Sequence, residues 1–589
     1  MAFVVLSHRT RINLKHRGMR MAATYEPATG ADSGNTLHRA IDWRGAFWVA
    51  SGVPALVLFS IGGIAGTAGK LAFVVWTVSM IMGFLQSFTY AEIAGLFPNK
   101  SGGASVYGAT AWLRYSKLIA PLSVWCNWFA WSPVLSLGCA IAAGYILNAV
   151  APIPAFTEQS PEVIAWLADP ANTGKAAADA ITAVTAVHTP AIQSFNALSV
   201  AVPGLGTLNF NSSFFIGAVL MLIVFAIQHR GILGTANAQK YIGLLVIIPM
   251  LIVGIVPLIN GQFHASNVAG PYLPGVGDNV GWTLFFGAMF IAAWSTYAFE
   301  TAICYTREFR NPRTDTFKAI FYSGLLCLLL YILVPFTFQG VLGVEGMKDP
   351  GIVTGTGVAD AMANMVASGN AFIKEVFVAL MILALVLAIM TAMAGSSRTL
   401  YQGSVDGWLP RYLSHTNEHG APTRAMWTDL VFNLFLLAIA SDSGGYFFIL
   451  AVSNVGYIIF NFLNLNAGWM HRVDSGHLDR PYRAPTWLIG LNTVLAFVNA
   501  LFMGAGAKVW GYSNALLVGF IFAGLIIPVF AFRHYVQDKG QFPKGALEDL
   551  GLTGQDLGER KAGILPYLAL LGGIAVVLVA NWYFQMPPS

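Results

Sequence analysis

Long apolar segments separated by short polar ones run along almost the whole chain. From Ala46 to the C-terminus, apolar runs of about 20 residues recur, each long enough to cross a bilayer as a helix. Only 10% of the residues are charged, against about 25% in soluble proteins, so a chain of several soluble domains is excluded. The pattern predicts an all-α integral membrane protein with spans near 46–66, 71–94, 118–150, 212–228, 238–260, 282–305, 316–341, 371–395, 425–441, 445–470, 485–505, 512–532 and 563–584.

The distribution of positive charge predicts how these spans are oriented. If the first span leaves the cytoplasm, nearly all of the 32 Lys and Arg residues fall on inside segments. The residues that remain outside are Lys70, Lys175, Lys348, Lys374 and Lys508. Because cytoplasmic loops carry an excess of Lys and Arg, this split predicts a multi-pass protein of the cell membrane, embedded in the lipid bilayer, with its N-terminus in the cytoplasm.

Three segments lie outside the regular alternation of spans and short loops. The polar and basic tail, 1–44, is most simply a disordered cytoplasmic arm, to which we assign no function. The long outside loop, 151–210, contains amphipathic stretches near Glu162–Leu167 and Lys175–Val187, which predict helices in a surface insertion, a lid or a partner surface. The charged cytoplasmic loop, 533–562, leads to an extra C-terminal helix at 563–584, whose role stays open.

The chain carries no pattern typical of an enzyme or of a metal site. Its four cysteines all lie within predicted spans, and no CxxC pair or Cys/His cluster is present. Nothing resembles a nucleotide-binding loop or a catalytic triad. We therefore expect no enzyme activity, no cofactor, no metal and no nucleic-acid partner, while the oligomeric state stays open.

The first span contains residues that disturb a helix in its inner half. Ser51, Gly52, Val53 and Pro54 follow one another there. Proline removes one helical hydrogen bond and glycine loosens the helix further. Within a bilayer, such a break is tolerated only where it is buried in protein or lines a cavity. The residues predict either a discontinuous helix that binds a solute, or a simple kink or close helix packing contact.

The sixth span has a matching cluster in its inner half. Trp294, Tyr297, Ala298 and Phe299 lead to Glu300, a carboxylate within an apolar helix. Such a charge costs roughly 2.5–3.5 kcal/mol even on lenient insertion scales, so it usually serves a function. Trp294 and Ala298 are four residues apart and share a helical face that could cover a bound solute. The alternatives are core packing for the aromatic residues and a helix–helix hydrogen bond for Glu300.

Four motifs together resemble the amino acid–polyamine–organocation (APC) transporter superfamily. In members of the superfamily these motifs lie at the end of the second helix, in the region of the sixth helix, in the eighth helix and its loop, and in the loop before the eleventh helix. In this chain they are YAEIAGLFPNKSGGASVYGA (Tyr90–Ala109), YAFETAICYTREFRNPRTDTFKAI (Tyr297–Ile320), GSSRTLYQGSVDGWLP (Gly395–Pro410) and RPYRAPTW (Arg480–Trp487). The matches keep their order and cover most of 46–532.

This resemblance implies a LeuT-like fold of two five-helix repeats, 45–260 and 282–470, inverted in the membrane plane and followed by helices in 485–532. It implies that amides around Ser51–Pro54 hold the carboxylate of an amino acid and that carbonyls of the first and sixth helices hold its ammonium. The spacing from Trp294 to Glu300 is similar to that of arginine–agmatine antiporters. That similarity implies a gating tryptophan and a proton-sensing role for Glu300.

The chain departs from the superfamily pattern at several positions that bear on ion coupling. SGVP replaces the usual GSGIF-type motif, and Ala298 replaces a glycine. The fifth-helix lysine of proton-coupled relatives has no counterpart in 243–249. Thr391 lies near the Thr/Ser pair that binds sodium in other relatives, but Ala392 follows it. Coupling to H+, coupling to Na+ and exchange therefore all stay open.

Further polar residues occur at membrane depth or at the inner ends of helices. Asn127, flanked by tryptophans, either faces the pocket or hydrogen-bonds between helices. Arg398, Arg411 and Arg424 are expected on the inside, at the interface or at a cytoplasmic gate.

Three functions fit these observations. The favoured one is a secondary active permease for amino acids, in which rocking of helices one, two, six and seven opens the inside. A polyamine or monoamine carrier is the first alternative, and it would need more pocket carboxylates than Glu300 alone. A sensor that binds amino acids without transporting them is the second.

Overall fold

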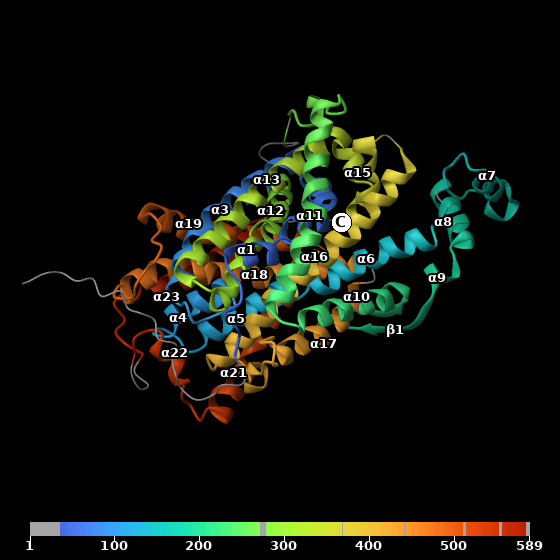
Figure 1. The fold of residues 1–589 in the computed structure, drawn as a ribbon. Helices are drawn as coiled ribbons and strands as arrows, with labels where there is room; N and C mark the ends of the chain where they lie inside the picture. The colour runs from blue at the N-terminus through green and yellow to red at the C-terminus, as the bar shows by residue number, and fades with distance from the viewer. Residues whose placement is uncertain are drawn as a thin grey trace, which may run out of the picture.

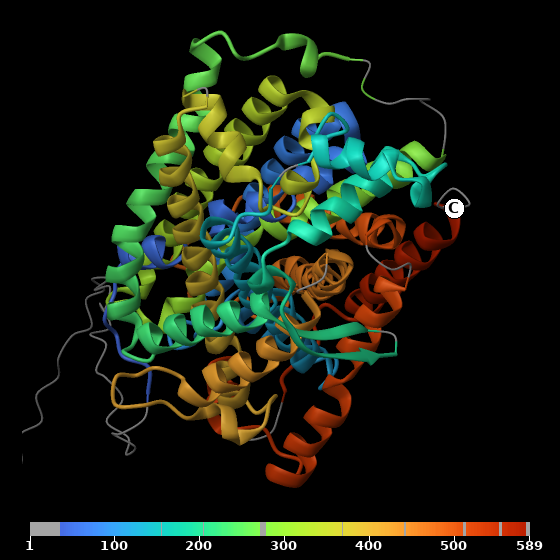
Figure 2. The same ribbon diagram turned by 90° about the vertical axis from the view of Figure 1, so that its right-hand side faces the viewer.

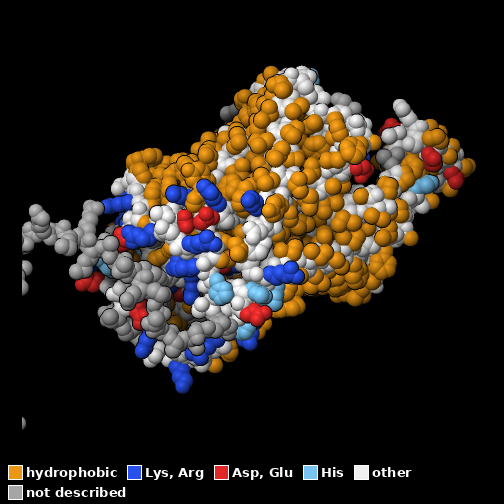
Figure 3. Space-filling view, in the orientation of Figure 1, with side chains coloured by type: hydrophobic (Ala, Val, Ile, Leu, Met, Phe, Trp, Pro, Cys, Tyr) orange, Lys and Arg blue, Asp and Glu red, His pale blue; other side chains and the backbone are white. Residues whose placement is uncertain are grey.

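Helices make up most of the computed structural model, which describes residues 36–154, 156–203, 205–270, 272, 279–367, 369–440, 443–510, 514–552 and 557–584. Within these ranges, 11 helices are long and apolar enough to cross a membrane. The span expected at 46–66 is interrupted, and the one at 212–228 is a shorter apolar helix of 17 residues. Apolar side chains cover the long side of the bundle (Figure 3). The protein is therefore a multi-pass helical membrane protein.

The first half of the chain contributes the interrupted first span, three long helical segments and a projecting lobe (Figure 1). Its elements are α1 (Trp43–Val49), η1 (Val53–Phe59), α2 (Ile61–Ala68), η2 (Gly69–Leu71), α3 (Ala72–Gly95), α4 (Ala104–Trp112), α5 (Ile119–Trp131), α6 (Val134–Val150), α7 (Pro161–Ala168), η3 (Pro170–Asn172), α8 (Ala177–His188), α9 (Ala191–Ser194), β1 (Asn196–Val202), β2 (Gly206–Asn211), α10 (Ser212–Gln228), α11 (Ile232–Ile259) and η4 (Ala265–Asn267).

The second half contributes the sixth span, which also changes helix type, and the remaining long helices. Its elements are α12 (Asn279–Thr296), η5 (Ala298–Glu308), α13 (Pro312–Met347), α14 (Pro350–Val353), α15 (Val358–Ala367), α16 (Ala371–Val405), η6 (Arg411–Ser414), α17 (Thr423–Ala440), α18 (Ser443–Asp474), α19 (Thr486–Gly506), η7 (Ala507–Val509), α20 (Ala515–Gly524), α21 (Ile526–Ala531), the π-helix η8 (Phe532–Gln537), α22 (Lys544–Glu548) and α23 (Leu565–Tyr583).

The lobe between α6 and α10 contains the two predicted amphipathic helices and one element that sequence analysis did not predict. α7 and α8 are the predicted helices, and they share a small core of Val163, Ala180 and Val184. The further element is an antiparallel hairpin of β1 and β2 beside α10 and α17 (Figure 2). Gly206 supplies a φ of 101° at the start of β2, a conformation that favours glycine.

The end of the N-terminal tail is packed against the protein and does not belong to a free arm. Leu37 and Ile41 are buried, and the amides of Ala40 and Ile41 both donate to the carbonyl oxygen of Glu308 at 3.0 and 3.2 Å. The amide of Arg310 donates back to Ile41 at 2.8 Å. This contact joins the tail to the C-terminal end of η5. The rest of the tail, 1–35, lies outside the described residues.

The extra C-terminal helix α23 packs along α19. A Cβ at Gly504 would lie 2.4 Å from the carbonyl oxygen of Val577, so glycine permits this close approach. The loop before α23 is also fixed to the bundle, because the amide of Ala562 donates to the Asp474 carboxylate at 3.0 Å. In Figure 1, α22 and the lobe helix α7 lie at opposite ends of the molecule.

Candidate substrate and ion site

The first span is interrupted where its sequence reads SGVP, at 51–54. α1 ends at Val49, and after a turn the chain continues as the 3-10 helix η1. Pro54 lies in the first turn of η1, where a helix loses nothing by lacking an amide hydrogen. A Cβ at Gly52 would lie only 2.4 Å from the carbonyl oxygen of Leu387 on α16. The predicted break is thus present, and glycine lets α16 approach the opened backbone.

Thr391 of α16 pairs with the backbone groups that the break frees. Its hydroxyl donates to the carbonyl oxygen of Val49 at 2.7 Å and accepts from the amide of Gly52 at 3.2 Å. It also accepts from Nε2 of Gln239 on α11 at 3.0 Å. Ser51 points elsewhere, since its hydroxyl donates to a carbonyl oxygen of α1 at 2.6 Å. Sequence analysis singled out Ser51, Gly52 and Thr391, but it missed Val49 and Gln239, which lie in ordinary helical stretches.

Tyr331 of α13 links the two interrupted spans. Its hydroxyl lies 2.7 Å from the carbonyl oxygen of Val53 and 3.1 Å from that of Ser295. The hydroxyl of Ser295 donates to the carbonyl oxygen of Leu56 at 3.3 Å. The first and sixth spans therefore meet at a buried centre of backbone carbonyls. Sequence analysis missed Tyr331, because nothing in its own span distinguishes it from the neighbouring aromatic residues.

Glu300 is buried in η5, with a side chain only 1% exposed. One oxygen accepts from Nε1 of Trp131 at 3.0 Å and from Nδ2 of Asn127 at 3.5 Å. The other oxygen accepts from the amide of Ala104 at 3.4 Å. The Asn127 side-chain oxygen accepts in turn from Thr399 of α16 at 3.0 Å. Within the described part of the chain no cation forms an ion pair with Glu300, so only neutral donors face it.

The aromatic residues around Glu300 do not share one face. Trp294 donates to a carbonyl oxygen of α5 at 3.1 Å, and its ring centre lies 6.0 Å from that of Phe59. Tyr297 donates to an asparagine of α19 at 3.0 Å, and the Phe299 ring packs against a glycine of α13. Ala298 is fully buried. The structure therefore places Trp294 beside the first span, while Tyr297 and Phe299 point toward other helices.

A second buried carboxylate, which sequence analysis did not single out, is Asp429 of α17. It accepts from Nε1 of Trp128 at 2.6 Å, from Ser132 at 2.7 Å and from Ser396 of α16. Its donors are all neutral, as they are for Glu300. The end of α5 thus donates hydrogen bonds to two carboxylates. Positions 127 and 131 donate to Glu300, and positions 128 and 132 donate to Asp429. The sequence feature that could have revealed this carboxylate is a single aspartate within an apolar span.

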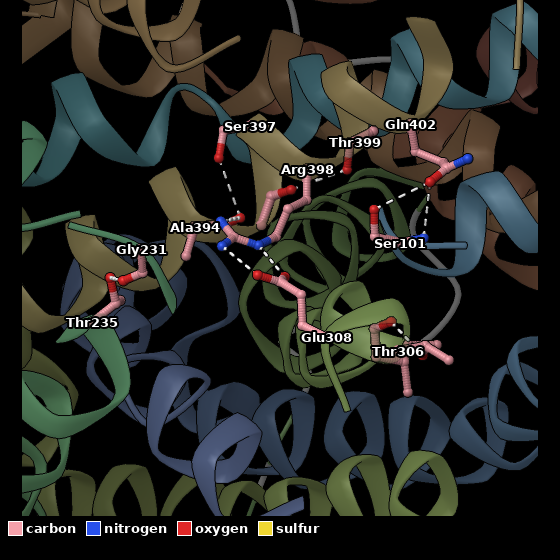
Figure 4. Close-up of polar contacts among 12 residues, drawn as sticks. Ser101, Gly231, Thr235, Thr306, Glu308, Ala394, Ser397, Arg398, Thr399 and Gln402 are labelled. Carbon is pink, nitrogen blue, oxygen red and sulfur yellow. Dashed lines mark hydrogen bonds and ion pairs between the residues drawn. The ribbon is translucent and has the colours of Figure 1, made fainter. Parts of the chain in front are cut away.

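A buried ion pair lies between the C-terminal end of η5 and α16 (Figure 4). Arg398 places Nε 2.6 Å and Nη2 3.0 Å from the two carboxylate oxygens of Glu308, and both side chains are at most 4% exposed. Arg411 pairs with Asp538 at the surface, and Arg424 lies over an aromatic ring. Of the three arginines expected at an inner gate, only Arg398 is buried in the bundle.

Comparisons with known proteins agree with this architecture. Residues 41–526 match the family described as "Amino acid permease". The chain is 24% identical to the branched-chain amino acid permease BcaP of Lactococcus lactis, over 45% of this chain and 54% of that protein. It is 30% identical to the histidine permease of Saccharomyces cerevisiae, over 35% and 36%, and 24% identical to BcaP of Bacillus subtilis, over 41% and 48%. The matches span about half, or less, of these relatives.

The fold and the interrupted spans define a multi-pass membrane protein with a buried polar centre between its helices. Because the family match covers most of the chain, the protein belongs to the amino acid permease family. This confirms the resemblance to the APC superfamily.

Proposed function

We propose that the protein is a secondary active transporter that moves amino acids across the cell membrane by alternating access. The observation that carries this proposal is the meeting of two interrupted spans at the carbonyls of Val53 and Ser295, bridged by Tyr331. In transporters with discontinuous helices, freed backbone groups of this kind bind the substrate and the coupling ion. Relatives named as permeases for branched-chain amino acids and for histidine support amino acids as the substrate class.

We infer the organisation of the fold from the two interrupted spans. Segments 45–260 and 282–470 are inverted repeats, each opening with an interrupted span, and 485–532 completes the core. The cytoplasmic side is the end that carries α22, because Lys and Arg side chains gather toward that end in Figure 3. The first described segment, 36–42, packs against the C-terminal end of η5, which supports the proposed cytoplasmic placement of the tail.

When an amino acid binds, its charged groups take the places of the two side-chain hydroxyls that pair with the interrupted backbone. Its carboxylate accepts from the amide of Gly52 in place of the Thr391 hydroxyl. Its ammonium donates to the carbonyls of Val53 and Ser295 in place of the Tyr331 hydroxyl. Each exchange keeps a buried backbone group paired, which matters because an unpaired buried group costs about 1–3 kcal/mol.

Coupling to protons fits the site better than coupling to sodium. The Thr391 hydroxyl already accepts two hydrogen bonds, from Gly52 and Gln239, so its oxygen is not free to ligate Na+ in this arrangement. Glu300 is a buried carboxylate faced only by neutral donors in the described structure. We assign the proton-sensitive role to Glu300. The neighbouring Trp294 serves as the gate on the outer side.

The proposal is tested by thermal unfolding of the detergent-purified protein with each of the twenty amino acids, putrescine, spermidine and agmatine. A ligand present at about 100 times its Kd stabilises the folded state by about 2.7 kcal/mol. We expect stabilisation by a few amino acids, followed by their uptake into proteoliposomes. Stabilisation by amines alone would favour the polyamine carrier, and binding without any uptake would favour the sensor.

Added bulk at Gly52 is expected to abolish uptake. In Gly52→Leu the new side chain meets the backbone of α16, because even a Cβ would lie 2.4 Å from Leu387. Overpacking of this kind costs about 1–3 kcal/mol, enough to reduce uptake about tenfold or more. Ala298→Leu is expected to act in the same direction. Gly66→Leu is the matched control, since no atom lies within 4 Å of a Cβ there.

Both variants are first checked for cooperative unfolding without ligand, and the effect of ligand is measured from each variant's own unfolding temperature, so that a loss of folding is not mistaken for a loss of binding. Ligand-induced stabilisation is then measured for each variant. If Gly52→Leu and Ala298→Leu both retain the stabilisation seen in the wild type, the substrate does not bind between the interrupted spans.

A further inference from the structure

A polar cavity of about 750 Å³ lies at the end of the bundle that carries α22, away from the proposed substrate site. Its walls come from the end of η5, the end of α16, the loop containing η6 and the segment from η8 to α22. The charged side chains that line it are Arg307, Arg411, Arg533, Lys544 and Asp538. Tyr401, Ser404, Ser414 and Gln541 add hydrogen-bonding groups.

The charges in this basic cavity do not cancel. Among the described residues that line it, Asp538 is the one acidic residue, and it pairs with both Arg411, at 2.7 Å, and Arg533, at 2.6 Å. Arg307 and Lys544 form no ion pair with any residue that the structure describes. Four cations against one carboxylate leave a local surplus of positive charge. Such a concentration of like charges is unfavourable unless an anion offsets it.

Arg533 gives a second and independent indication of a ligand. Its side chain is 5% exposed, which is unusual for an arginine without complete pairing. Nε donates to Asp538, but Nη1 is buried and has no hydrogen-bond partner in the described structure. A buried donor without a partner costs about 1–3 kcal/mol. Nη1 has no accessible surface, so an acceptor oxygen in the cavity removes that penalty once the guanidinium turns toward the cavity that Arg533 lines.

We propose that this basic cavity binds a phosphate-bearing anion. Phosphate oxygens match the planar fork of a guanidinium, and three arginines line the cavity. The volume exceeds that of a single phosphate ion and lies in the range of small-molecule sites, so the ligand carries further atoms. Either a soluble phosphorylated molecule or the headgroup of an anionic lipid provides this chemistry.

An anion in the cavity joins three elements next to the buried ion pair. Arg307 directly precedes Glu308 in η5, while Tyr401 lies one turn beyond Arg398 on α16. Arg533 and Lys544 belong to the segment that leads to α23. Bridging these elements holds η5 and α16 together at the end where alternating access would separate them. The bound anion therefore stabilises the closed inner arrangement and slows transport.

The test measures binding without transport, so its result does not depend on the proposed substrate. The full chain in detergent is heated with pyrophosphate or with sodium chloride of equal ionic strength. In a second arm the protein is placed in nanodiscs of phosphatidylcholine, with or without phosphatidylglycerol. The variants are Lys544→Gln and Arg307→Gln, whose side chains are at least partly exposed, and the control is Lys561→Gln in the same loop.

We expect stabilisation of the wild type and of Lys561→Gln, with an affinity about tenfold weaker in each cavity variant. A rise in unfolding temperature with pyrophosphate identifies a soluble phosphorylated ligand. A rise only with phosphatidylglycerol identifies a lipid headgroup. The proposal is overturned if neither arm gives a shift, or if Lys544→Gln and Arg307→Gln respond as the wild type does.

Discussion

Replacing Glu300 with glutamine is expected to remove the pH dependence of amino acid uptake while the protein still folds. Glutamine preserves the size of the side chain and keeps an oxygen that accepts from Trp131 and Asn127. It cannot exchange a proton. A process depends on pH when a group binds protons differently in the two conformational states that it connects. Removing that group therefore removes the dependence of uptake on pH. For proton-coupled import, wild-type uptake is higher at acidic than at neutral pH. In Glu300→Gln the ratio of uptake at acidic pH to uptake at neutral pH falls to about one.

Asp429→Asn is the matched control for this experiment. Asp429 is also a buried carboxylate with neutral donors, but it lies on α17 and outside the interrupted spans. Uptake is measured in proteoliposomes across a range of external pH, with each variant at equal reconstituted amount. We expect Asp429→Asn to keep the wild-type pH profile. If instead Glu300→Gln keeps that profile and Asp429→Asn loses it, the proton-sensitive group is Asp429 and our assignment is wrong.

Sequence analysis located the breaks because their causes are local. The residues SGVP contain a proline and a glycine that disturb any helix, and Glu300 is conspicuous in an apolar span. Their partners could not be deduced in the same way. Gln239 and Tyr331 reach the opened backbone from spans that look ordinary, and only the packing of α11 and α13 brings them there.

The directions of the later side chains of the sixth span could not be predicted, for a geometric reason. Grouping Trp294 with Ala298, and with Tyr297 close by, assumed the 3.6-residue turn of an α-helix. That pattern holds as far as Tyr297, whose amide donates to the carbonyl oxygen of Ala293. From Ala298 the chain continues as the 3-10 helix η5, with three residues per turn, so the side chains that follow are rotated relative to an α-helix. Phe299 accordingly contacts α13 and Glu300 contacts α5, while the grouping of Trp294, Tyr297 and Ala298 around a substrate stays a prediction.

Breaking the buried ion pair between Arg398 and Glu308 is expected to have the largest effect on stability. In Arg398→Met the Glu308 carboxylate stays in a fully buried position without its partner. Leaving one charge of a buried pair uncompensated costs about 3–5 kcal/mol. We expect the double variant Arg398→Met/Glu308→Leu to recover most of this loss, because apolar replacements of both partners are often neutral or stabilising. Thermal unfolding of the purified variants measures both effects.

The control is the surface pair of Arg313 and Asp479, whose side chains are 62% and 66% exposed. Arg313→Gln is expected to change stability by less than about 1 kcal/mol, because water and salt screen exposed pairs. The two cycles together separate burial from charge, since both pairs join an arginine to a carboxylate. A coupling energy for Arg398 and Glu308 as small as that of the surface pair would mean that the buried contact does not hold η5 against α16. Closure of the inner end would then depend on the contacts of the N-terminal segment with Glu308 and of Thr399 with Asn127.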